Sequence, residues 1–225
     1  MKRIYIACFI AWFAFLGCAA IKETWLAITG EEEEYSAQEL AWTAMDYYKG
    51  GDYERSIEKF EKLKDWFPFS RYAILAELKI GDAHYNLEQY EEAIFAYEEF
   101  EKLHPRNEAV PYVIYQIGRC YYDRIDTIDR DQVPARKALE TFQRLIKQYP
   151  KDEYARLAED HISVCYKSLA GNEYYIGLFY FKSKHYEAAY SRFMAVVSNY
   201  PDVGYHQKAL RYIAECQASI SPPKK

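Results

Sequence analysis

Residues 87–105 read LEQYEEAIFAYEEFEKLHP, and this stretch shows the fold of the chain more clearly than any other. Apolar and aromatic residues recur in it every three or four positions, with glutamate and lysine between them. That spacing predicts one apolar stripe along an α-helix. Proline cannot continue a helix, so Pro105 marks the end of the predicted element.

The same order of residues recurs at three further places along the chain. The order is a tyrosine, a small residue three positions later, an aromatic four beyond that, and a proline after two more turns. The copies are Tyr53, Ser56, Phe60 and Pro68; then Ala138, Phe142 and Pro150, without the tyrosine; then Tyr186, Ala189, Phe193 and Pro201. A small residue facing a ring lets two helices pack closely, so each copy is predicted to be the second helix of a hairpin. This pattern is typical of the tetratricopeptide repeat.

The repeats predict an all-α protein, an α-solenoid of about five tetratricopeptide-like helical hairpins over residues 36–220. Ser36 and Glu39 form a predicted capping box at the start of the first helix. Gly171 and Asn172 are predicted to separate two helices, and residues 124–133 form a charged insertion whose role the sequence leaves open. The ten predicted helices cover 37–49, 53–67, 70–87, 89–103, 111–123, 134–149, 153–169, 173–182, 186–200 and 205–219.

The N-terminus has the features of a secretory signal peptide, predicted over residues 1–17. Lys2 and Arg3 precede an uncharged apolar run that is too short to span a bilayer comfortably. Gly17-Cys18 resembles a bacterial lipobox, which predicts lipid attachment at Cys18 and a lipid-anchored tether over 18–35. Ala19 resembles the sorting rule for the outer membrane. An ordinary signal peptide with a coincidental cysteine is the alternative. Residues 221–225 are predicted to be a tail.

The composition argues against nucleic-acid binding and against catalysis. Loss of Lys2 and Arg3 with the signal peptide takes the formal charge from −5 to −7, and an acidic surface disfavours nucleic acid. The five histidines lack metal-ligand spacing, and no phosphate loop or nucleophile elbow occurs. The sequence therefore predicts no catalytic residue, no metal and no cofactor. Three cysteines of the helices are predicted to be buried thiols, with a disulfide between two of them left open: Cys120, Cys165 and Cys216.

One candidate binding surface emerges from the repeat register. The first helices of the hairpins line the concave side of such a solenoid. Tyr48, Tyr85 and Tyr122 occupy one repeat position. A second repeat position, a turn earlier on the same helices, holds Met45, Asp82 and Arg119. Stacked tyrosines would form a groove for an extended peptide with aromatic side chains, and Arg119 would be available for a carboxylate. The alternative is that the rings pack between neighbouring hairpins.

Four further stretches of the chain match a more specific pattern than the repeat alone. They are Pro68-Phe69-Ser70-Arg71-Tyr72; His104-Pro105 with Tyr112-Val113-Ile114-Tyr115 and Gly118; Asp129-Arg130-Asp131 with Ala135-Arg136; and Arg192 with Tyr200-Pro201-Asp202. In these stretches the chain resembles the BamD/ComL family, the tetratricopeptide lipoproteins of the outer-membrane β-barrel assembly machine. The resemblance covers nearly all of the mature chain and includes linkers as well as helices.

The resemblance implies an outer-membrane lipoprotein that faces the periplasm and serves as a scaffold for inserting β-barrel proteins. The implied partners are the barrel-forming subunit, unfolded outer-membrane substrates and accessory lipoproteins. It places an arginine at position 192 in the region that docks on the barrel-forming subunit. Arg192 has no partner on its own helix, because the residues three and four away are alanines and a valine. The alternatives are an adaptor in cell-envelope maintenance or division, and an accessory subunit of a periplasmic enzyme.

Overall fold

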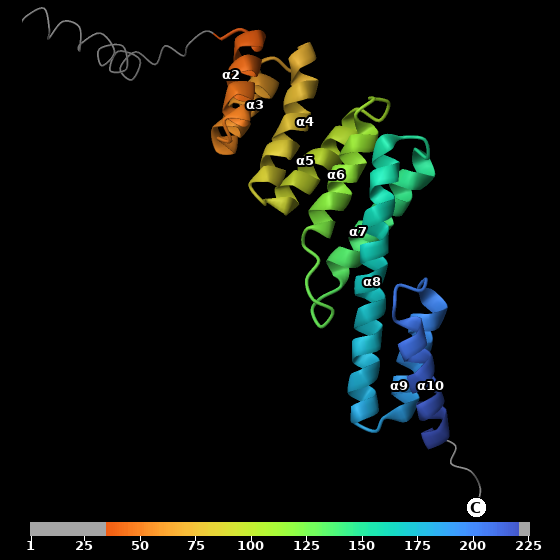
Figure 1. The fold of residues 1–225 in the computed structure, drawn as a ribbon. Coiled ribbons are helices and arrows are strands. Elements are labelled where there is room, and N and C mark those ends of the chain that lie inside the picture. The colour runs from red at the N-terminus through yellow and green to blue at the C-terminus, as the bar shows by residue number, and fades with distance from the viewer. Residues whose placement is uncertain (1–34, 221–225) are drawn as a thin grey trace, which may run out of the picture.

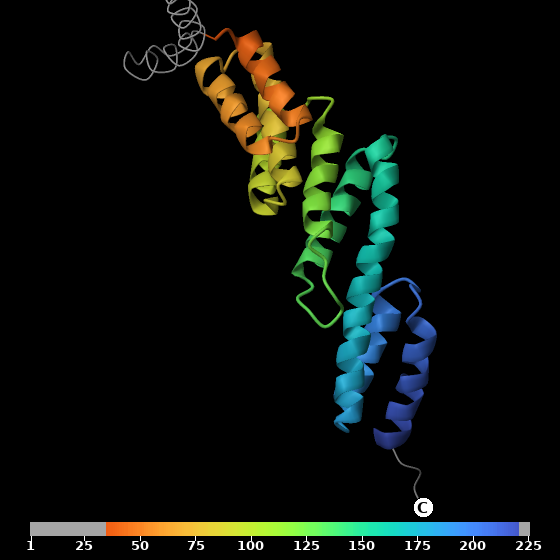
Figure 2. The same ribbon diagram turned by 60° about the vertical axis from the view of Figure 1, so that its left-hand side comes forward.

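The computed structural model describes residues 35–220, which form nine α-helices and no strand. The predicted signal peptide, the tether up to residue 34 and the tail lie outside the described residues. The helices stack into an elongated array whose two ends are far apart (Figures 1 and 2). In chain order they are α2 (Ala37–Lys49), α3 (Tyr53–Trp66), α4 (Arg71–Asn86), α5 (Tyr90–Leu103), α6 (Val110–Tyr122), α7 (Val133–Gln148), α8 (Glu153–Lys182), α9 (Tyr186–Asn199) and α10 (His206–Ile220).

The first described helix, α2, begins with the hydrogen bonds that its sequence predicts. The backbone N–H of Glu39 donates to Ser36 Oγ at 3.2 Å, and the Ser36 N–H donates to Glu39 Oε2 at 2.8 Å. The predicted capping box is therefore confirmed. Gly51 follows the helix at φ +80°, a backbone conformation that favours glycine. Apart from the break discussed below, the predicted helix boundaries agree with the structure to within one residue.

Close packing within the hairpins depends on glycines that face aromatic rings. A Cβ on Gly81 would come within 2.7 Å of the Tyr97 ring, and a Cβ on Gly118 within 2.4 Å of the Phe142 ring. Gly177 faces Phe193 in the same way, at 2.7 Å. In these three pairs the first helix therefore has no side chain where the ring of the second helix lies. The rings predicted from the repeat are fully buried: Phe60, Tyr97, Phe142 and Phe193.

The predicted break at Gly171-Asn172 is wrong, because α8 runs without interruption through both residues as a helix of 30 residues. Gly171 is buried, and a Cβ there would lie 2.8 Å from both the Ile128 side chain and the Tyr205 hydroxyl. Asn172 Nδ2 donates to the Ile128 carbonyl at 2.6 Å. Both residues therefore allow another segment to approach the helix, and two predicted helices are one.

The insertion of residues 124–133 is the segment that approaches α8. The buried side chain of Gln132 holds the insertion together by hydrogen bonds. Its Nε2 donates to the carbonyls of Thr127 at 3.2 Å and Arg130 at 3.0 Å. Ser168 Oγ of α8 then donates to Gln132 Oε1 at 2.7 Å. The insertion thus fixes the middle of the long helix to the hairpin of α6 and α7.

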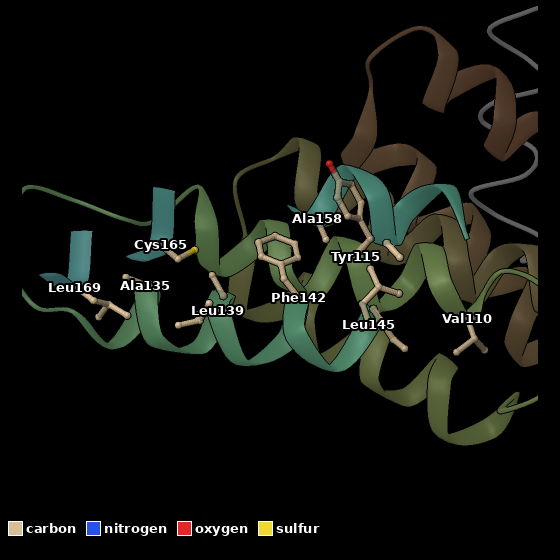
Figure 3. Close-up of a cluster of buried hydrophobic side chains, with 12 residues drawn as sticks. Val110, Tyr115, Ala135, Leu139, Phe142, Leu145, Ala158, Cys165 and Leu169 are labelled. Carbon is tan, nitrogen blue, oxygen red and sulfur yellow. The ribbon is translucent and has the colours of Figure 1, made fainter. Parts of the chain in front are cut away.

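The largest apolar cluster lies between α6, α7 and the first half of α8. Phe142 is at its centre, with Tyr115 and Leu145 close by (Figure 3). Each cysteine of the described helices belongs to a different cluster, Cys120, Cys165 and Cys216, and all three thiols are free and buried. Burial raises the pKa of Cys120 and of Cys165 to about 12, so both thiols stay protonated. The prediction of buried thiols is confirmed.

Candidate functional site

The three tyrosines of the predicted peptide groove each contact the first helix of the next hairpin. Asn86 Nδ2 of α4 donates to the Tyr48 hydroxyl of α2 at 3.2 Å. Arg119 of α6 donates to the Tyr85 hydroxyl of α4 at 2.9 Å. The Tyr122 ring of α6 lies 4.4 Å from the His161 ring of α8, measured between centroids. The rings therefore follow one face of the array.

The ring contacts of Tyr48 and Tyr85 are made within their own hairpins and not with the next tyrosine of the predicted stack. Tyr48 packs edge to face on Tyr53 at 5.4 Å, and Tyr85 packs likewise on Tyr90 at 5.9 Å, each within its own hairpin. All three tyrosines are half-buried. The geometry supports the alternative in which the rings join neighbouring helices, while leaving part of each ring accessible. Binding of a peptide stays a prediction.

Arg119 belongs to a polar group that the sequence did not anticipate in full. The Tyr85 hydroxyl donates to the Asp123 carboxylate, and Arg119 forms an ion pair with Asp123 at 3.2 Å. Burial, helped by the Asp123 carboxylate, raises the pKa of Tyr85 well above its ordinary value, so the phenol keeps its proton. The Nε of Arg119 is buried and has no acceptor among the described residues. One donor of this guanidinium therefore remains unused.

Asp82 is the most buried charged residue of the concave side, with 2% of its surface exposed. It accepts hydrogen bonds from the hydroxyls of Tyr97 at 2.7 Å and Tyr112 at 2.6 Å. Lys79 forms an ion pair with it at 2.7 Å. The carboxylate thus joins α4, α5 and α6 at one point. A single acidic residue on the small and apolar stripe of α4, with lysine three positions earlier, is the sequence signal that could have revealed this.

Lys79 also connects Asp82 to the first hairpin. Its Nζ lies 4.9 Å from the centroid of the Tyr48 ring, a distance typical of a cation–π contact. Burial raises the pKa of Tyr48 to about 12, and the Asp82 charge acts in the same direction. The helices α2, α4 and α6 therefore share a continuous polar and aromatic surface.

The aromatic surface continues onto α8. Tyr112 packs on Tyr154 with centroids 5.3 Å apart, and the Tyr115 hydroxyl lies 2.9 Å from His161 Nε2. Burial lowers the pKa of His161, and the Arg119 charge adds to this, so the imidazole is neutral at pH 7. Rings with hydroxyl and imidazole groups at their edges suit the recognition of aromatic side chains and peptide carbonyls.

Arg192 of α9, the predicted docking residue, has a partner on another helix. Its Nη1 lies 3.0 Å from Glu173 Oε2 of α8, and the two side chains are 43% and 21% exposed. The sequence correctly excluded a partner on α9 itself, but it could not show Glu173. Arg192 lies on α9, whereas the three tyrosines lie on α2, α4 and α6, so the two predicted sites are on different helices.

Two observations bear on other classes of function. In residues 35–220 no three histidine, cysteine, aspartate or glutamate side chains are grouped so that they could hold a metal ion. None of the described helices combines the length and apolarity needed to cross a membrane.

A family profile and a curated relative that match this chain both have names that refer to the outer membrane. The family profile named YfiO, described as outer membrane lipoprotein, matches residues 33–224. An outer membrane protein assembly factor BamD of Caulobacter vibrioides is 31% identical over 188 residues, which cover 84% of this chain and 62% of the relative. The chain therefore spans less than two thirds of the length of that relative.

A second relative and one solved structure extend the comparison. BamD of Neisseria meningitidis serogroup A is 26% identical over 202 residues, covering 85% of this chain and 76% of the relative. The TPR2AB domain of yeast Sti1, in a complex named for pHSP90, superposes with a TM-score of 0.45 and 16% identity, covering 82% of this chain and 70% of that one.

Proposed function

This chain belongs to the YfiO family of outer membrane lipoproteins, and from that premise we propose that it is a non-catalytic scaffold in outer membrane protein assembly. Its curated relatives carry the name outer membrane protein assembly factor. The observation that supports a scaffold is the division of the array into two surfaces. The concave aromatic surface around Asp82 occupies the N-terminal part, and the Arg192 region lies near the C-terminus.

The partners are part of the proposal. The N-terminal hairpins bind the C-terminal signal of unfolded barrel substrates, and the C-terminal helices dock on the barrel-forming subunit. Co-purification from detergent-solubilised envelopes tests this function. Recovery of the barrel-forming subunit supports it. Recovery of division or envelope-maintenance proteins alone, or of a periplasmic enzyme, would instead support the alternative roles.

The groove prediction concerns Tyr85 and Tyr122. An aromatic contact contributes on the order of 1 kcal/mol beyond area burial, so replacing both tyrosines by alanine is expected to weaken binding of a peptide ending in phenylalanine roughly tenfold or more. Fluorescence anisotropy of a labelled peptide measures this.

The matched control for this prediction is Tyr85→Phe. It keeps the ring but removes the hydroxyl that bonds Asp123 and Arg119. If the ring binds peptide, Tyr85→Phe retains most of the affinity. A double alanine variant with a lowered melting temperature and unchanged peptide affinity would show that the rings serve packing alone.

We also propose that Cys18 carries the lipid and that the chain lies on the periplasmic face of the outer membrane. Cys18→Ser is expected to abolish acyl labelling, and the protein should no longer sediment with the outer membrane through its own tether, because two acyl chains hold a protein stably and none remains. Cys120→Ser is the control, since that thiol is buried in the fold. Unchanged acyl labelling of Cys18→Ser would contradict the lipobox assignment.

A further inference from the structure

A groove with a volume of about 450 Å³ lies on the side of α4 that faces away from the candidate peptide groove. Its floor includes Ile80, and its walls come from α3 and α5. Asp82 follows Ile80 by two residues, which is about 200° around an α-helix. The groove is therefore a separate surface from the concave site that Asp82 organises.

Among the described side chains, no ion pair joins α3 to α5 across the groove. In the next repeat, Arg144 of α7 pairs with Glu101 of α5 through two hydrogen bonds of 2.5 and 3.1 Å. The corresponding residues of α5 and α3 are Glu99 and Lys64, counted from the buried rings of these helices. These charges are opposite, yet within the described helices Glu99 pairs with Lys102 on its own helix, at 3.5 Å. The groove between α3 and α5 therefore lacks the kind of ion pair that joins α5 to α7 in the next repeat.

Apolar side chains of α5 line the groove and are unusually exposed. Phe95 is 68% exposed and Leu103 is 59% exposed. They are eight positions apart, which is about 80° around the helix, so both lie within one broad stripe of it. Ile80 and Phe100 also line the groove, but they are buried, so Phe95 and Leu103 supply most of the apolar surface that the fold itself does not cover.

The rim of the groove is acidic. Five glutamates line it, against Lys64 and His84: Glu61, Glu77, Glu91, Glu92 and Glu99. Glu91 pairs with Arg124 at 2.7 Å, and Glu77 contacts His104 at 2.5 Å. Glu61 and Glu92 have no ion pair among the described residues. An apolar floor with a negative rim favours a cationic partner.

We propose that this groove binds a basic amphipathic segment of a partner protein. Bulky apolar side chains of the segment occupy the space over Ile80 and beside Phe95, and its lysines or arginines face the rim carboxylates. The chain's own ends fit less well. The tether has Glu31 to Glu34 next to the fold, which repel an acidic rim. Lys224 and Lys225 lie within five residues of Ile220, where α10 ends at the far end of the array (Figure 1), and five extended residues reach only about 17 Å.

The test uses the full-length protein in detergent and a labelled synthetic peptide of about 16 residues, with leucine, phenylalanine and lysine at helical spacing. Anisotropy at about 0.15 M salt measures its affinity. A second peptide has glutamate in place of lysine. We expect the basic peptide to bind and the acidic one not to bind. Phe95→Asp should weaken binding about tenfold or more, without loss of helix content, because this side chain is mostly exposed.

Phe179→Asp is the matched control, since Phe179 is 64% exposed on α8 and lies outside the groove. It should bind the basic peptide as the unaltered protein does. Equal loss in both variants, equal binding of both peptides, or no binding of the basic peptide would overturn the proposal. So would a rise in affinity of about tenfold on deletion of residues 19–34, because the tether would then be the occupant.

Discussion

Asp82→Ala is expected to lower the free energy of unfolding by about 3 kcal/mol. Removing one member of a buried ion pair typically costs about 3 to 5 kcal/mol, and the lower value applies because Lys79 is 23% exposed and can reach water. The Tyr97 hydroxyl cannot do so, since Tyr97 is fully buried. For a chain of this size the melting temperature should fall by about 6 to 12 °C. Circular dichroism during heating and urea denaturation measure both quantities.

Asp46→Ala is the control for this prediction. Asp46 is exposed on α2, so its loss should change stability by no more than about 0.5 kcal/mol. Asp82→Asn separates the two contributions to the network, because the amide oxygen still accepts from tyrosine but no longer carries charge for Lys79. A stability change below about 1 kcal/mol for Asp82→Ala would show that the network does not hold α4, α5 and α6 together.

The second large effect is expected for Arg192→Glu, measured as release of the barrel-forming subunit in co-purification. Truncating one partner of a buried, hydrogen-bonded charge pair at an interface costs about 2 to 5 kcal/mol of binding, which corresponds to a loss of affinity of about thirtyfold or more. The variant should fold, because Arg192 is 43% exposed and its pair with Glu173 contributes little to stability.

The pair with Glu173 provides the decisive control. If Arg192 acts only by fixing α9 to α8, Glu173→Gln should release the partner as Arg192→Glu does. The exchanged variant, Arg192→Glu with Glu173→Arg, should then restore binding, because it rebuilds the pair between the helices. If Arg192 contacts the partner directly, Glu173→Gln retains binding and the exchanged variant does not. Full retention of the partner by a folded Arg192→Glu protein would remove the docking role.

Local signals made most of the fold predictable. The capping box at Ser36, the prolines after the second helices and the spacing of Phe60, Tyr97, Phe142 and Phe193 each act within one or two turns of the chain. Such signals depend on the residues that start or stop a helix and on the spacing of one apolar stripe. They can therefore be recognised without knowing which helices pack alongside. The family resemblance rested on other stretches, which include linkers such as Pro68 to Tyr72, and it is confirmed by the profile match over residues 33–224.

The candidate sites were only partly predictable. The repeat register placed Tyr48, Tyr85 and Tyr122 on one face, but it could not show that each contacts the next first helix. Asp82 was placed at a groove position, yet its burial depends on three donors, two of them tyrosines of α5 and α6. Partners that are 15 or 30 residues apart leave no local pattern.

By itself, the sequence determined the helices, their pairing into hairpins and the buried rings, because those follow from periodicity and from residues that start or stop a helix. The tertiary structure alone decided what Gly171 does. A glycine followed by asparagine has the local signature of a helix end. Here the packing of Ile128 and Tyr205 against the bare backbone, with the hydrogen bond from Asn172, stabilises a continuous α8. Contacts between distant segments outweighed a local preference of about 1 kcal/mol.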